Sequence, residues 1–83
     1  MPPPITLTIR FDRELQKITS KEEHPAIINE GAPFSFLLMS VFAEYPEIEN
    51  KYPPGTLGFT INGEPPKLYS PLFDGDVVSF FVS

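Results

Sequence analysis

The chain has 83 residues, a formal net charge of −5 and no cysteine. This length is enough for one small domain, so we treat residues 1–83 as a single domain. The lack of cysteine excludes disulfides and thiolate chemistry, and the acidic balance disfavours binding to nucleic acids. No signal peptide is visible and no apolar run is long enough to cross a membrane. We therefore expect a cytoplasmic protein that binds neither nucleic acid nor membrane.

The first part of the chain predicts two strands. In Ile5–Phe11 every second residue is apolar and the residues between them are Thr or Arg, which is typical of a strand with one buried face. Residues 12–24 are polar and lack a clear period, so we expect a loop there. Residues 25–29, with the sequence PAIIN, are short and apolar. They predict a second strand that pairs with the first through a long hairpin.

The pattern changes to that of a helix at Phe34. Six apolar residues follow at relative positions 0, 3, 4, 7, 8 and 11, which places them on one side of an α-helix. They are Phe34, Leu37, Leu38, Val41, Phe42 and Tyr45. Pro33 suits the start of a helix, and Pro46 is expected to end this one, because the residue before a proline disfavours the helical region. Residues 47–55 are interpreted as a linker.

The last third of the chain predicts short strands joined by turns. Residues 56–61 (TLGFTI) alternate as a third strand, and Asn62-Gly63 is a strong signal for a tight turn. Residues 67–70 (KLYS) are interpreted as a short edge strand, and residues 71–76 (PLFDGD) as a turn. Residues 77–83 predict a closing strand, with Val78, Phe80 and Val82 on one face and Val77, Ser79, Phe81 and Ser83 on the other.

These elements predict an α+β fold in which one amphipathic helix covers one face of a mixed four- to five-stranded sheet. The opposite face of the sheet is then left open to solvent or a partner, and it carries Thr8, Arg10, Thr60, Ser79 and Phe81. Phe81 is expected either to anchor an interface or to be covered by the chain's own residues 12–24. An uncovered edge at residues 67–70 is compatible with a monomer or a weak oligomer.

The sequence offers no convincing catalytic or metal site. His24 is the single histidine and is interpreted as a solvated loop residue, because no second histidine or cysteine completes a metal site. The carboxylates at Glu44, Glu47 and Glu49, and those that flank Gly75, are assigned to helix ends and turns. Neither a nucleophilic triad nor a glycine-rich phosphate loop is present. We expect no catalytic residue, no metal ligand and no cofactor.

The order of elements is that of the β-grasp, or ubiquitin-like, fold. Residues 29–48 (NEGAPFSFLLMSVFAEYPEI) resemble the Gly-Ala turn, amphipathic helix and Tyr-Pro of the MoaD/ThiS sulfur carriers. Residues 59–81 (FTINGEPPKLYSPLFDGDVVSFF) look like that family's third strand, Asn-Gly turn, Asp-Gly-Asp turn and closing strand. The Phe80-Phe81 pair resembles the molybdopterin-synthase small subunit more than the thiamine carrier.

The resemblance implies a non-enzymatic carrier role in molybdenum cofactor biosynthesis. In such carriers an activating enzyme adenylates a terminal Gly-Gly carboxylate, which becomes a thiocarboxylate, and a synthase subunit receives the sulfur. Here Phe81 is followed by Val82 and Ser83 rather than Gly-Gly, so the chain as written is not expected to carry sulfur. The alternative is a non-carrier ubiquitin-like interaction or regulatory module. Either role predicts a protein partner that contacts Arg10, Thr60, Ser79 and Phe81.

Overall fold

A computed structural model describes residues 3–53 and 55–82. The elements follow in the order β1 (Pro4–Phe11), α1 (Arg13–Thr19), β2 (Glu23–Asn29), α2 (Phe34–Glu44), α3 (Pro46–Lys51), β3 (Leu57–Ile61) and β4 (Val77–Val82). Within the described ranges, none of the helices has the length and apolar character needed to cross a bilayer.

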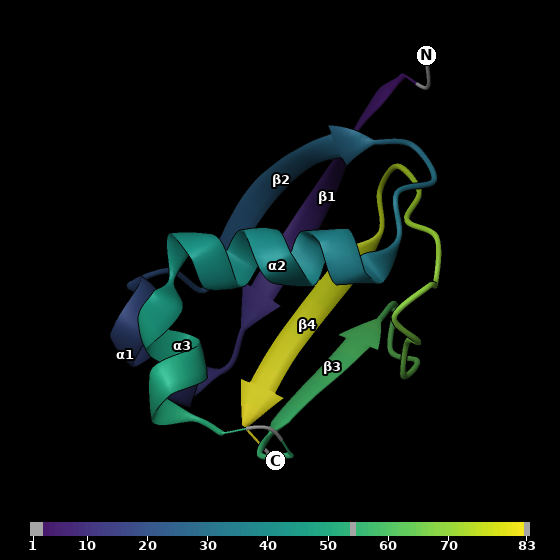
Figure 1. Ribbon diagram of the computed structural model, residues 1–83. Helices are drawn as coiled ribbons and strands as arrows, with labels where there is room; N and C mark the ends of the chain where they lie inside the picture. The colour runs from purple at the N-terminus through teal and green to yellow at the C-terminus, as the bar shows by residue number, and fades with distance from the viewer. Residues whose placement is uncertain (1–2, 54, 83) are drawn as a thin grey trace.

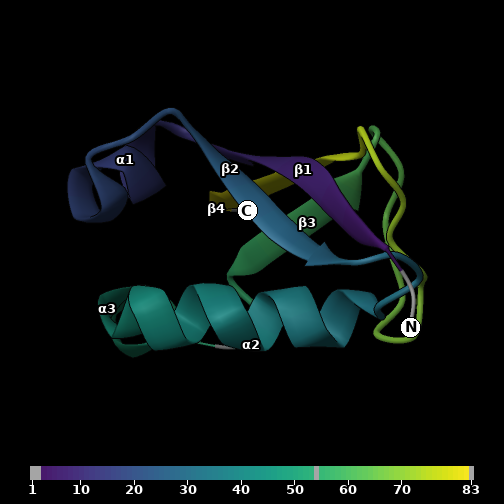
Figure 2. The same cartoon turned by 90° about the horizontal axis from the view of Figure 1, so that it is seen from above.

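The four strands form one mixed sheet in the order β2-β1-β4-β3. The central strands β1 and β4 run parallel, and β2 and β3 flank them as antiparallel edge strands (Figure 1). Viewed from above, α2 and α3 lie on one side of the sheet, while α1 lies beyond one end of it (Figure 2). The predicted α+β, β-grasp arrangement is therefore confirmed, with four strands.

The core fills the space between the sheet and α2. The alternate residues of β1 and β4 that were predicted to face inward are buried, except Val82, which is half-buried at the margin of the core. Phe34, Leu37 and Val41 of α2 close over them. Leu38, Phe42 and Tyr45 pack against this core at its margin. Phe80 is the centre of an aromatic cluster, with ring centroids 5.1 Å from Phe59 and 5.8 Å from Phe11. The predicted apolar stripe is thus the surface that holds helix and sheet together.

The prediction of a loop at residues 12–24 was wrong, because residues 13–19 form α1. Asp12 caps this helix, its Oδ1 atom accepting from the Leu15 N–H at 2.9 Å. Leu15 is fully buried and Thr19 is nearly so. A cap residue followed by buried residues three and seven positions later is a recognisable helix signal, although the surrounding charges obscured it.

The linker predicted at residues 47–55 is also partly helical. Pro46 ends α2, as predicted, and at the same time occupies the first turn of α3, where its missing N–H has no cost. Ile48 is the only residue of α3 that is fully buried, and this one contact attaches the short helix to the core.

The edge strand predicted at residues 67–70 is absent from the described chain, and this segment contacts the start of α2 instead. Pro33 provides no side-chain cap for α2. The carbonyls of Leu68 and Ser70 replace it by accepting from the N–H groups of Ser35 at 2.9 Å and Phe34 at 2.8 Å. Free N–H groups at a helix start need such partners. The segment therefore provides hydrogen-bond acceptors for the first N–H groups of α2 and does not extend the sheet.

Candidate functional site: the outer face of the sheet

The sheet has one face that no helix covers, and we call it the outer face (Figure 2). It consists of alternate residues of the four strands, whose registers place them side by side. Its members are Glu23, Pro25 and Ile27 of β2, Thr6, Thr8 and Arg10 of β1, Val77, Ser79 and Phe81 of β4, and Gly58 and Thr60 of β3.

Three of the four predicted interface residues form a single row across this face. Arg10 of β1 pairs in register with Ser79 of β4, and Ser79 pairs with Thr60 of β3. Glu23 of β2 extends the row on the other side of Arg10. Arg10 is exposed, and its guanidinium lies 3.9 Å from a carboxylate oxygen of Glu22, with both side chains more than half exposed. Such a pair is weak and easily exchanged for another partner.

Phe81 lies in the next row and packs on Gly58. The two residues are register partners on β4 and β3. A Cβ atom at Gly58 would overlap the Cε2, Cζ and Cδ2 atoms of the Phe81 ring, so only glycine leaves room for the ring to lie on the β3 backbone. Phe81 is half-buried. The ring is therefore packed against its own sheet, and part of it still faces solvent.

The end of β4 is fixed by Asp12. The Oδ2 atom of Asp12 accepts from the Val82 N–H at 2.8 Å, while its backbone N–H donates to the Phe80 carbonyl at 3.1 Å. One carboxylate therefore caps α1 and holds the last described residue of the sheet. Val82 continues β4 as predicted, and Ser83 lies outside the described residues. Sequence reasoning missed this role of Asp12, because Val82 lies 70 positions away in the chain.

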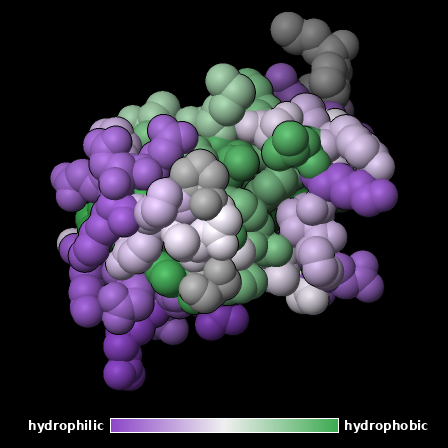
Figure 3. Space-filling model, turned by 60° about the horizontal axis from the view of Figure 1, so that its bottom comes forward, coloured by the Kyte–Doolittle hydropathy of each residue, from purple (hydrophilic) through white to green (hydrophobic). Residues whose placement is uncertain are grey.

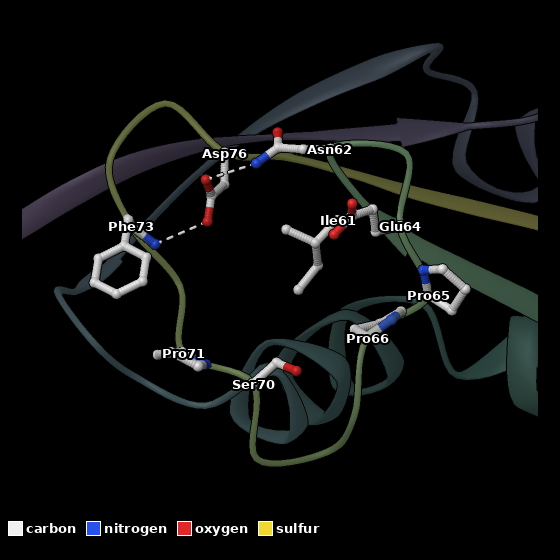
Figure 4. A pocket seen from close by; sticks show the side chains of 9 residues that line it. All are labelled: Ile61, Asn62, Glu64, Pro65, Pro66, Ser70, Pro71, Phe73 and Asp76. Atoms are coloured by element: carbon white, nitrogen blue, oxygen red, sulfur yellow. Dashed lines mark hydrogen bonds between the residues drawn. The ribbon is translucent and has the colours of Figure 1, made fainter.

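The Asp-Gly-Asp turn acts as a structural clamp next to the outer face. Asp76 accepts from the Asn62 side chain through Oδ1 and from the Phe73 N–H through Oδ2, both at 2.9 Å (Figure 4). Asn62 in turn accepts from the Val77 N–H at 2.9 Å, and Asp74 accepts from the Thr6 N–H at 2.9 Å. The turn-forming role predicted for these aspartates is confirmed. They connect the turn before β4 to the end of β3 and to β1, at one end of the sheet.

The remaining titratable residues do not build a recognisable reaction centre. His24 lies in β2, not in a loop, and its side chain is only about one-fifth exposed, with Nε2 3.7 Å from a Glu44 carboxylate oxygen. The interpretation of His24 as a solvated loop residue was therefore wrong. Within residues 3–53 and 55–82, no three His, Cys, Asp or Glu side chains gather closely enough to hold a metal ion.

Neither the protein-family models nor the curated proteins include a match to this sequence. Solved structures do match it. One is a protein of Pyrococcus furiosus provisionally named molybdopterin converting factor, subunit 1, with a TM-score of 0.84, 17% identity and coverage of 94% of this chain and 97% of that one. Another is small archaeal modifier protein 1 of Haloferax volcanii, with a TM-score of 0.81, 14% identity and coverage of 94% of both chains.

The small archaeal modifier protein 1 of Methanosarcina acetivorans is also similar, with a TM-score of 0.73, 15% identity and coverage of 96% of this chain and 94% of that one. These similarities extend over nearly the full length of each of the compared proteins. They place the chain in the ubiquitin-like β-grasp fold class, among structures that include a converting-factor subunit and small protein modifiers. At these identities the shared property is the fold, and site residues have to be argued from this chain itself.

Proposed function

We propose that this chain is a small ubiquitin-like protein that works by docking its outer face on a protein partner, and that it has no catalysis of its own. The observation that carries the proposal is the row Arg10–Ser79–Thr60 next to Phe81. These residues combine an accessible cation, two hydroxyls and a partly exposed aromatic ring on a rigid surface. Interfaces are enriched in Arg and aromatic residues, and these residues contribute much of the binding energy.

The rigidity of the outer face supports this proposal. Main-chain pairing fixes its strands, Asp12 and Asp76 hold the two ends of β4, and the Phe81 ring packs closely on Gly58. A surface that is ordered before binding loses little conformational freedom on association. It is thus better suited to recognition than a flexible loop.

The partner that we propose is an activating enzyme or a synthase subunit of the sulfur-carrier type. This proposal combines the resemblance of residues 29–48 and 59–81 to sulfur carriers with the fold shared with a converting-factor subunit. In carrier chemistry, a terminal carboxylate displaces pyrophosphate from ATP to give an acyl adenylate. A sulfur donor then displaces AMP to leave a thiocarboxylate. The second candidate is use of the same surface as a protein modifier or adaptor, which the fold shared with small archaeal modifiers favours.

The docking proposal is tested by binding of the full chain to the adenylating enzyme of the same organism, measured by calorimetry. Ser79→Arg puts a long cation in the centre of the outer face, and we expect binding to weaken by more than about tenfold, a loss of about 1.4 kcal/mol. Ser40→Arg is the matched control, because Ser40 is exposed on α2, away from the sheet. Equal effects of the two substitutions would contradict an outer-face interface.

The carrier step is tested separately by mass spectrometry of the protein as its own cells make it, after incubation with that enzyme, ATP and a sulfur donor. Replacement of one oxygen by sulfur at the carboxyl terminus supports the carrier role. Covalent attachment to other proteins in place of that exchange supports the modifier role. Binding that is blocked by Ser79→Arg without either covalent change supports the adaptor role.

A further inference from the structure

The two edges of the sheet differ in how they are protected. On β2, residues Glu23, Pro25 and Ile27 direct their main-chain groups away from β1, because the bond from the Glu30 N–H to the Pro3 carbonyl sets the alternation along this pair. Pro25 has no N–H, so the middle of this edge has no donor for another strand. A proline at such a position is a common device against strand addition.

The β3 edge has no such protection within its described residues. The Asn62 N–H donates to the Val77 carbonyl at 2.8 Å, and by alternation Thr60 and Gly58 direct their main-chain groups toward β4. Leu57 and Phe59 therefore direct theirs outward. Residues 67–70, which the sequence predicted as an edge strand, bond to the start of α2 instead. Within the described chain, the strand position beside β3 is left vacant.

An apolar groove runs beside this vacant position, between α2 and β3. Its walls are Leu38, Phe42, Tyr52, Leu57 and Phe59, and its volume is about 240 Å³. Cavities that bind small molecules are larger, at about 300–1,000 Å³, so this groove fits a single apolar side chain. Figure 3 shows apolar surface across the middle of the molecule between two polar regions. A strand that added to β3 would direct every second side chain toward the groove.

The charges near the edge indicate which strand would bind. Glu49 lines the groove, and Glu64 follows the hairpin at the other end of β3, where Ile61 and Glu64 bond to each other. Lys51, which precedes the groove-lining Tyr52, already lies over the ring of that tyrosine at 5.6 Å. A second copy would bring the same acidic residues together, and each copy has a net charge of −5. Like charges in such a position are unfavourable.

We propose that the β3 edge is a second docking site, which takes an extended segment of a protein partner by strand addition. The N–H and carbonyl groups of Leu57 and Phe59 provide the main-chain bonds, and the groove takes one bulky apolar side chain. Glu49 and Glu64 favour basic residues on either side of that side chain. Strand addition of this kind gains affinity from main-chain bonds and specificity from alternate side chains. The site is separate from the outer face, since it uses the edge and the helix-covered side of β3.

The test uses the full chain and a phage-displayed library of random ten-residue peptides. We expect the selected peptides to share a bulky apolar residue flanked by lysine or arginine. Titration of the best peptide should shift the amide NMR signals of Leu57 and Phe59 most and slow their hydrogen exchange. Replacement of its basic residues by glutamate should weaken binding by about tenfold or more, as expected when charges clash across an interface.

Chemical synthesis of the chain provides the decisive variant, because it leaves every side chain in place. Changing the amide N–H of Phe59 to an ester oxygen removes one outward donor, and we expect about a tenfold loss of peptide affinity, the size of one net main-chain hydrogen bond. The same change at Ile27 on the β2 edge is the matched control. Ser79→Arg should also leave peptide binding unchanged, which separates this site from the outer face. Peptides that map elsewhere, equal effects of both esters, or a stable dimer without peptide would overturn the proposal.

Discussion

The two faces of β4 show how one strand can serve stability on one side and recognition on the other. Val78 and Phe80 are buried against α2, with 0% and 1% of their surfaces exposed. Ser79 and Phe81, one residue further along in each case, lie half-buried on a face without a helix. The period of two that separates them is the simplest property of a strand. Substitutions on the outer face of β4 should therefore cost less stability than substitutions on its buried face.

The largest expected effect contrasts the two adjacent phenylalanines. Phe80→Ala should lower the free energy of unfolding by about 3–5 kcal/mol, because it empties the centre of the aromatic cluster. Phe81→Ala should cost distinctly less, since its ring keeps part of its surface in solvent. Urea unfolding of both variants measures the difference. Comparable losses would show that the outer face is as much a part of the core as the inner one.

A second prediction tests whether the Phe81 ring needs a glycine at position 58 to pack on β3. Gly58→Ala should cost about 1–3 kcal/mol, the usual range for an overpacked site. The cost should largely disappear in a chain that also carries Phe81→Ala, because the ring that the new methyl group meets is gone. A double-mutant cycle from thermal or urea unfolding measures this coupling. Additive losses would mean that Gly58 is needed for another reason.

A smaller effect is expected at the clamp. Asp76→Ala removes the acceptor of two hydrogen bonds and should destabilise the fold by about 1–2 kcal/mol. Asp74→Ala is the natural comparison, because it removes an acceptor for only one such side-chain bond, to Thr6, and should cost about half as much. Hydrogen exchange at Phe73 and Thr6 locates each loss. A larger cost for Asp74 would reverse the assigned roles.

The smallest effect on stability is expected at Arg10. Its pair with Glu22 is long and exposed, so Arg10→Ala should change the free energy of unfolding by less than about 1 kcal/mol. Partner binding should nevertheless weaken, because Arg10 stands in the row with Ser79. Parallel measurements of unfolding and of binding to the adenylating enzyme separate the two contributions. Loss of stability without loss of binding would place Arg10 outside the interface.

The strands and α2 could be predicted from the sequence because each has one face in the core. Alternation along Ile5–Phe11 and the three-and-four spacing from Phe34 report directly on that burial. The short helices α1 and α3 escaped prediction, since each attaches mainly through one fully buried residue, Leu15 or Ile48. A single fully buried side chain in a short helix does not produce a hydrophobic periodicity that the sequence can show.

The outer face was predictable in part. Strand parity placed Arg10, Thr60, Ser79 and Phe81 on one surface, but their alignment in adjacent rows depends on register, which sequence alone does not fix. The vacancy beside β3 was not predictable. Residues 67–70 have the composition of an edge strand, and only the unsatisfied N–H groups at the start of α2 explain why their carbonyls are used there instead.

The central claim is that the outer face, rather than the exposed side of α2, meets the adenylating or synthase partner. It is tested most directly by a photo-crosslinking amino acid placed at Ser79 or at Met39, an exposed residue of α2, in the full chain expressed in its own cells. The account predicts a discrete protein adduct from position 79, which excess unmodified chain abolishes and excess Arg10→Glu chain does not. A competed adduct from position 39 but none from position 79 would contradict it.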